Sequence, residues 1–404
     1  MIAMGPQTRL LAQISVAHLI SHFHFMTVPA LLPVLPNAMK VSFVDLGIAL
    51  GVFNVVSALC QAPLGFAVDR FGARRVLMFG LALGSSGFAL VAAIPTYTGL
   101  LMGMAIAGVA NGVYHPADYA LLSQNMDARR MGRAFSIHTF AGFLGGAITP
   151  PIILGMALAF DLRWAFATAA VVGVITLTFV SLGSRGMPAA GQAAHAGEHS
   201  TDTRQPVRAA RATILVLTLL FMMLSLSTGA IERFSVTALV QGFQVPLSVA
   251  NIALTSFLFA SAFGVLAGGV LADRTSRHGF VAAIAFALAA LLVSMVILVR
   301  LPPPILILTL GATGFLTGVV APSRDMLVRA ASPAGQEGKT FGFVSTGLNI
   351  GGVIGPILYG LLLDNGLATS VLWASVGFMI VTTAIVIAQE LHRYDRRREA
   401  ISSP

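Results

Sequence analysis

The sequence repeats one pattern of glycines, prolines and charged residues after half its length. Seven positions recur 206 residues later with the same amino acid: Gly112, Pro116, Gly132, Phe135, Gly145, Gly146 and Pro150 correspond to Gly318, Pro322, Gly338, Phe341, Gly351, Gly352 and Pro356. Three more recur after 204 residues: Gly65, Asp69 and Arg70 correspond to Gly269, Asp273 and Arg274. A chain with this internal similarity is predicted to fold as two related structural units.

Both halves consist mainly of long apolar runs. Hydrophobic residues make up 56% of the chain and charged residues only 10%, whereas soluble domains carry about 25% charged residues. The runs are long enough to cross the hydrocarbon core as helices, the form that satisfies its own backbone groups in lipid. We predict spans at 10–33, 46–68, 76–95, 99–122, 134–158, 164–183, 213–240, 248–271, 280–299, 305–328, 340–363 and 368–390.

The predicted fold is therefore an all-α membrane protein with twelve transmembrane helices in two pseudo-symmetric six-helix bundles. We assign residues 1–183 to the first bundle and 213–404 to the second, which ends in a short basic cytoplasmic tail. Residues 184–212 are polar and aperiodic, which favours a flexible cytoplasmic linker. His195 and His199 lie in that linker, where we interpret them as solvated residues and not as a metal pair.

The basic residues predict the orientation in the membrane. Of the 24 lysines and arginines, 19 fall in alternate segments on one side of this span map, and the opposite loops hold only Lys40, Arg163 and Arg300. The positive-inside rule then places both termini in the cytoplasm. We expect a multi-pass, monomeric protein of the cell (inner) membrane. The net charge of +9 follows from this topology, so we expect no nucleic-acid partner.

Two loops resemble a known family signature. The segment Gly65-Phe-Ala-Val-Asp69-Arg70-Phe-Gly72-Ala-Arg74-Arg75 resembles the loop between helices two and three of the major facilitator superfamily. A degenerate copy with Asp273, Arg274 and Arg277 follows the eighth span. The resemblance covers the whole chain and implies a secondary transporter that works by alternating access. Within the superfamily, residues 111–118 and the first span resemble fosmidomycin-resistance-type exporters.

The resemblance also implies gating roles. The expected gate residues are Asp69, Arg70, Arg74, Arg75, Asp273, Arg274 and Arg277. A carboxylate at a helix end can accept arginine hydrogen bonds and face the positive end of another helix. The glycines of the fifth and eleventh spans, which include Gly142, Gly145, Gly347 and Gly351, are expected to line the interface between the two halves.

Polar residues inside spans are expensive and are therefore functional candidates. Asn111, Tyr114, His115 and Asp118 form one stripe, at helical spacings i, i+3, i+4 and i+7. His18 and His22 share a face of the first span, whereas His24 points elsewhere and His138 is interpreted as isolated. The predicted substrate-binding residues are His18, His22, Asn54, Asn111, Tyr114, His115, Arg233, Arg324 and Asn349. The predicted proton-coupling residues are Glu232, which ranks first, with Asp118 and Asp325.

Three functions are consistent with these residues. The first is proton-coupled export, by antiport, of a small organic compound or drug. The second is uptake or exchange of a small organic anion held by Arg233 and Arg324. The third is transport of a divalent metal by His18, His22, His115 and Asp118.

The other motifs narrow the class of protein. The chain has no phosphate-binding loop and no hydrolase motif, so we expect neither an enzyme nor an ATP-driven pump. The lone Cys60 excludes an internal disulfide framework. We predict no cofactor and no resident metal; the expected partners are the small-molecule substrate, protons and the lipid bilayer.

Overall fold

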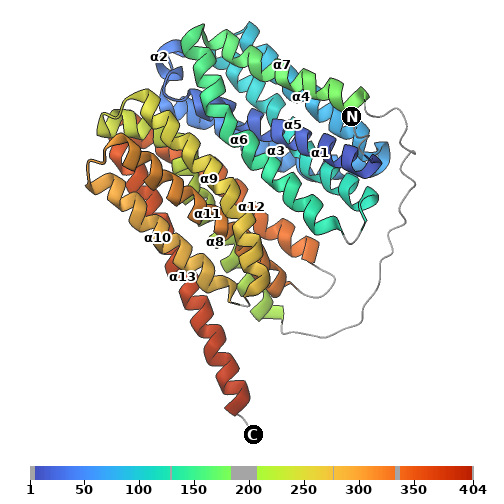
Figure 1. The fold of residues 1–404 in the computed structure, drawn as a ribbon, viewed down its shortest axis with the longest axis vertical. Helices are drawn as coiled ribbons and strands as arrows, with labels where there is room; N and C mark the ends of the chain where they lie inside the picture. The colour runs from blue at the N-terminus through green and yellow to red at the C-terminus, as the bar shows by residue number, and fades with distance from the viewer. Residues whose placement is uncertain (1–4, 128–129, 183–206, 276, 333–336, 403–404) are drawn as a thin grey trace. The chain divides into compact units, whose positions relative to one another are not determined.

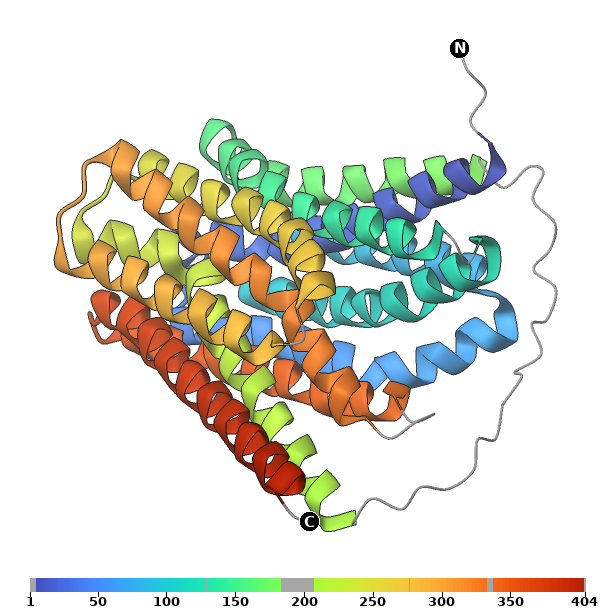
Figure 2. The same ribbon diagram turned by 60° about the horizontal axis from the view of Figure 1, so that its bottom comes forward.

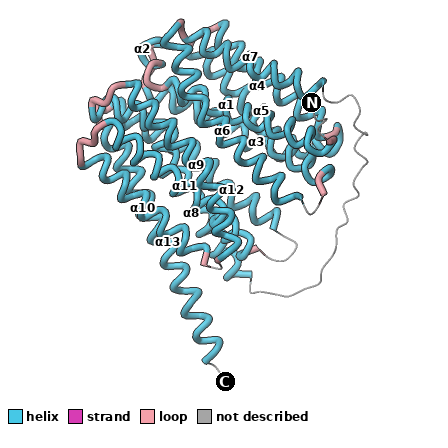
Figure 3. The backbone as a smooth tube through the Cα atoms, in the orientation of Figure 1, coloured by secondary structure: helices cyan, strands magenta, loops and turns pink. Residues whose placement is uncertain are grey.

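The computed structural model describes residues 5–127, 130–182, 207–275, 277–332 and 337–402 of the 404-residue chain. Within these ranges the protein consists of thirteen helices and short connections, without a β-strand (Figures 1 and 3). The predicted linker 184–212, with His195 and His199, lies largely outside the described residues. Its last six residues, 207–212, belong to a helix, so the prediction of an aperiodic segment is wrong there.

The chain divides into two compact units. One comprises residues 1–196 with 356–364, and the other comprises 197–355 with 365–404. The helices before the linker are α1 (Pro6–Leu31), α2 (Leu35–Met39), α3 (Phe43–Phe71), α4 (Ala73–Ala93), α5 (Tyr97–Asn125), α6 (Met131–Ala159) and α7 (Leu162–Leu182). Those after it are α8 (Val207–Phe243), α9 (Leu247–Arg274), α10 (His278–Leu298), α11 (Pro303–Ala331), α12 (Glu337–Asp364) and α13 (Ala368–Ser402).

The twelve predicted spans are confirmed as helices, because one long helix covers most of each predicted interval. Among the described residues, eleven helices are long and apolar enough to cross a membrane. The remaining long helix is α5, whose hydropathy is lowered by polar residues such as Asn111, His115 and Asp118. The apolar runs do not predict the short α2, which begins at Leu35 and has Pro36 in its first turn.

The two units pack their helices in corresponding pairs. In the first unit α3 packs on α5, and α4 packs on both α5 and α7. In the second unit α9 packs on α11, and α10 packs on both α11 and α13, which Figure 2 shows running alongside α10. The repeat seen in the sequence is therefore also a repeat of helix packing.

Glycines on α6 and α12 allow close approach to the first helix of their own half. A Cβ atom at Gly142 would lie 2.5 Å from His18 Nε2 on α1, and Gly145 lies against the backbone carbonyl of Leu19. On α12, Gly347 and Gly351 lie against α8 in the same way. These contacts lie within each half, and that the four glycines also line the interface between the halves stays a prediction. They serve packing beside α1 and α8, where only a glycine leaves enough room.

The turn between α3 and α4 depends on the second glycine of the signature loop. Gly72 has φ = 89°, a conformation that side chains rarely adopt. It ends α3 and starts α4 one residue later. Because the turn is this tight, Asp69 and Arg70 end one helix while Arg74 and Arg75 begin the next.

The other end of α3 is capped by two carboxylates. Ser42 and Asp45 form a capping box at its first turn. Asp364, which belongs to the same compact unit, accepts hydrogen bonds from the backbone N–H groups of Phe43 at 2.8 Å and Val44 at 2.9 Å. A negative charge at this position also complements the positive end of the helix dipole.

Candidate functional site

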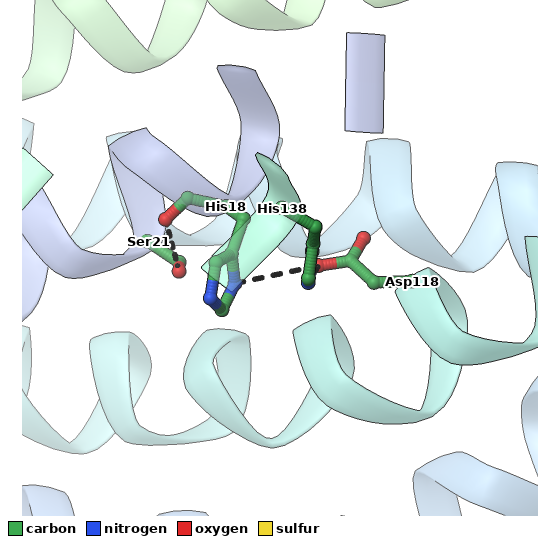
Figure 4. A network of polar contacts seen from close by, with 4 residues as sticks. All are labelled: His18, Ser21, Asp118 and His138. Carbon is green, nitrogen blue, oxygen red and sulfur yellow. Dashed lines mark hydrogen bonds and ion pairs between the residues drawn. The ribbon is translucent and has the colours of Figure 1, made fainter. Parts of the chain in front are cut away.

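Three helices of the first unit bring four histidines and one aspartate together. His18 and His22 come from α1, His115 and Asp118 come from α5, and His138 comes from α6. His18 Nδ1 and His138 Nε2 each lie 3.6 Å from the same oxygen, Oδ2 of Asp118. Figure 4 shows both imidazole rings beside this carboxylate. We call these five residues the histidine–aspartate cluster.

His18 lies at the centre of the cluster. Its ring stacks on that of His138 with centroids 4.0 Å apart, and it meets His22 edge-on at 4.7 Å and His115 at 5.6 Å. The backbone carbonyl of His18 accepts a hydrogen bond of 2.7 Å from the Ser21 hydroxyl (Figure 4). Two imidazoles thus lie beside the Asp118 carboxylate, and two more lie beside His18.

The centre of the cluster is buried and lacks hydrogen-bond partners. The exposed fraction is 0% for Asp118, 1% for His138 and 4% for His18. Among the described residues, none forms a hydrogen bond with either Asp118 oxygen, with His18 Nδ1 or with the two ring nitrogens of His138. The 3.6 Å contacts are too long for hydrogen bonds. Leaving a buried polar group unpaired costs about 1–3 kcal/mol, which makes this cluster a candidate functional site and not merely a packing feature.

His138 belongs to the cluster, although its place in the sequence suggests an isolated residue. That interpretation is wrong because the partners of His138 lie on α1 and α5, which periodicity along α6 alone does not reveal. One signal was available: His138, Gly142, Gly145 and Thr149 share one face of α6 at helical spacings. In contrast, His24 is confirmed to point elsewhere, since its Nε2 lies 2.9 Å from the Ala169 carbonyl.

The other predicted residues of the first unit lie around or apart from the cluster. Tyr114 is 2% exposed, and its hydroxyl has no hydrogen-bond partner among the described residues. Asn111 donates a hydrogen bond of 2.8 Å to the Ser57 hydroxyl on α3. Asn54 donates one of 2.7 Å to the Leu50 carbonyl of its own helix. Within the predicted stripe on α5, Asn111 therefore bonds to α3, whereas His115 and Asp118 belong to the cluster.

In the second unit, Arg324 pairs with its neighbour in the sequence. Its guanidinium lies 2.8 Å from the Asp325 carboxylate and 4.8 Å from the centre of the Phe221 ring. It lines a small cavity of about 30 Å³ whose other walls are mostly apolar. Because Arg324 already has an anionic partner, a substrate anion would have to compete with Asp325.

The remaining candidates of the second unit lie on α8 and α12. Arg233 on α8 is 9% exposed, while Glu232 beside it and Asn349 on α12 are half-buried. Glu232 and Arg233 are adjacent in the sequence, so their side chains leave the helix in directions about 100° apart.

The predicted gate residues differ in their surroundings. Asp69 lies in a groove of about 350 Å³ between α3 and α5, with Gly65 and Pro116 among its other residues. Arg74 donates hydrogen bonds to Gln13 on α1 and to the Val180 carbonyl on α7. Arg74 therefore ties α4 to two helices of its own unit. The other five predicted gate residues are exposed: Arg70, Arg75, Asp273, Arg274 and Arg277.

Twelve long helices in two similarly packed units, with titratable groups buried among them, define a multi-pass membrane protein of the secondary-transporter class. A family model described as the Major Facilitator Superfamily matches residues 14–237 and 217–402. The chain belongs to the Major Facilitator Superfamily. It is a membrane transporter and not an enzyme, as the sequence predicts.

Two relatives and one solved structure illustrate the range of similarity. The chain is 24% identical over 273 residues to the fosmidomycin resistance protein of Escherichia coli K12, a match that covers 66% of each chain, just under two thirds. It is 26% identical to the uncharacterized MFS-type transporter YfnC of Bacillus subtilis, over 87% of this chain and 85% of that one.

The solved structure is a bacterial homolog of the human lysosomal transporter Spinster, in an inward-facing and unoccupied conformation. It superimposes with a TM-score of 0.74 at 13% identity, over 95% of this chain and 97% of that one. At this identity the likeness establishes the shared fold. The twelve-helix fold of the family is thereby confirmed.

Proposed function

We propose that the protein exports a small organic compound in exchange for protons, by alternating access. In this proposal it acts as a monomer in the cell (inner) membrane, with both termini in the cytoplasm. The histidine–aspartate cluster is the site at which the proton binds, and Asp118 is its central group. The predicted substrate-binding residues line the path of the compound.

The observation that carries this proposal is the setting of Asp118. A proton-coupling group has to be a titratable side chain inside the bundle that is free to gain and lose a proton. Asp118 is fully buried, and its carboxylate oxygens have no hydrogen-bond donor among the described residues. The imidazoles of His18 and His138 lie 3.6 Å away, where they can hand a proton to it or receive one from it.

The surroundings of Asp325 and Glu232, the other two predicted coupling residues, favour proton coupling less. The Asp325 side chain is 45% exposed and already has a cationic partner in Arg324. Glu232 is half-buried and lies next to Arg233. We therefore place the main coupling step on Asp118 and keep Glu232 as a secondary group.

The direction of transport is proposed from the relatives. One relative is named for resistance to fosmidomycin. A membrane transporter can confer resistance to a compound by removing it from the cell. A small organic compound with an anionic group is consistent with that relative and with the buried Arg233.

The test is transport in proteoliposomes that carry an imposed pH gradient. Fosmidomycin and small carboxylates would be screened as substrates with the full-length protein. We expect substrate accumulation against its own gradient, driven by protons. Asp118→Asn should abolish this accumulation while exchange of substrate without a gradient persists, because the amide keeps the shape of the side chain and cannot carry the proton.

Asp161→Asn is the matched control. It makes the same chemical change at an exposed position, where Asp161 accepts a hydrogen bond from the Trp164 backbone, and it should leave accumulation unchanged. Proton-driven accumulation that survives in Asp118→Asn would remove the coupling role from Asp118. Exchange of anions that never responds to the gradient would favour the anion-exchange function instead.

A further inference from the structure

We propose that His18, His138 and Asp118 form a binding site for a divalent transition-metal ion of the zinc type. The ligand atoms are Nδ1 of His18, Nε2 of His138 and Oδ2 of Asp118. This inference goes beyond proton coupling, because the protein would bind the metal whether or not it moves protons.

The geometry of the three atoms is close to that of a zinc site. They all lie within 4.8 Å of one another, and both nitrogens lie 3.6 Å from the carboxylate oxygen. With bonds of about 2.0–2.2 Å, the ligand atoms of a tetrahedral zinc ion lie about 3.4 Å apart. Side-chain movements of a few tenths of an ångström would bring these two pairs to coordinating distances. The two nitrogens, which lie within 4.8 Å of each other, would have to approach by up to about 1.4 Å.

The ligand types favour particular metals. Two imidazoles and one carboxylate suit zinc and its first-row neighbours, whereas magnesium and calcium prefer an all-oxygen shell. Two further imidazoles are close, since the rings of His22 and His115 lie 4.7 Å and 5.6 Å from that of His18. His22 and His115 are therefore the candidates for a fourth ligand.

Metal binding would also satisfy atoms that the fold leaves unpaired. His18 Nδ1, His138 Nε2 and Asp118 Oδ2 are all buried without a hydrogen-bond partner among the described residues. A divalent ion would satisfy all three atoms, and the carboxylate would offset part of its charge in a site from which water is largely excluded. Packing alone does not explain why three such atoms converge from three helices.

The experiment is equilibrium metal binding to the full-length protein in lipid nanodiscs. The protein would be purified with a tag that contains no histidine, stripped with a chelator and titrated with zinc chloride. We expect about one bound zinc ion per chain, as in a mononuclear site. Cobalt chloride should give the visible absorption of a tetrahedral cobalt–imidazole complex, which is independent of transport.

Variants identify the ligands. His138→Ala and Asp118→Asn should each weaken zinc binding by more than about tenfold, since even changes around a metal ligand cost about 10–100-fold in affinity. His138→Gln provides a second, more conservative test if the alanine variant does not fold. The matched control is the double variant His195→Ala with His199→Ala, which removes the histidine pair of the linker sequence and should leave zinc binding unchanged.

Two outcomes overturn the metal proposal. One is the absence of zinc binding at millimolar metal, and the other is binding that disappears with the linker pair but persists in His138→Ala and Asp118→Asn. Neither outcome affects the proton proposal, which is tested by transport in chelator-treated proteoliposomes. Conversely, zinc binding at the cluster together with normal proton-driven transport in Asp118→Asn would retain the metal site and refute the coupling role.

Discussion

Gly142 has no side chain because two imidazoles occupy the space next to it. A Cβ atom at this position would lie 2.5 Å from His18 Nε2 and 3.0 Å from His22 Cδ2. Both values are below ordinary van der Waals contact, and the rings are held between helices. Gly142 is therefore a positioning residue, which sets how closely α6 and its His138 approach α1.

Gly142→Ala should destabilise the protein by about 1–3 kcal/mol, the usual cost of overpacking a filled interior. It should also displace His18 and so weaken both the proton and the metal functions proposed above. Gly155→Ala is the control on the same helix, because nothing lies within 4 Å of a Cβ atom there; a change within about 0.5 kcal/mol is expected. Thermal unfolding of both variants in detergent measures the difference, and equal melting temperatures would contradict the close packing of α6 on α1.

At the scale of elements, the α3–α4 connection relies on one backbone conformation. Gly72 has φ = 89°, whereas the other glycine of the same loop, Gly65, lies inside α3 with open space around it. Gly72→Ala should cost about 1–3 kcal/mol through backbone strain, while Gly65→Ala should be tolerated because alanine favours a helix. Unfolding temperatures compare the two, and a tolerated Gly72→Ala together with a damaging Gly65→Ala would contradict this account.

The elements also show what the sequence could predict. Apolar runs predict the spanning helices well, because a helix that crosses a membrane has to be both long and apolar. They do not indicate where helices continue beyond the lipid: α13 extends to Ser402, although its apolar part ends near Leu391. The stripe on α5 follows from spacing within one helix. Spacing also places His138 and Gly142 on one face of α6, but it does not indicate that this face contacts α1.

At the scale of the whole molecule, the basic residues predict a fixed orientation. Leu301 lies between α10 and α11, and Ser332 lies between α11 and α12, so the two positions should face opposite sides of the membrane. In a Cys60→Ser background, an impermeant maleimide applied to intact cells should label Leu301→Cys and not Ser332→Cys. Inverted vesicles are the control, where the pattern should reverse; labelling of Ser332→Cys in intact cells would place the termini outside.

The polarity of α5 has a consequence for the synthesis of the protein. The translocon inserts a helix according to its apolarity, and Asn111, His115 and Asp118 all oppose insertion. Helix α5 packs against α3 and α4, the two helices made just before it, so these more apolar neighbours can retain it in the bilayer. Because of the residues that would bind a proton or a metal, insertion of α5 in the nascent chain thus depends on α3 and α4 having emerged from the ribosome before it.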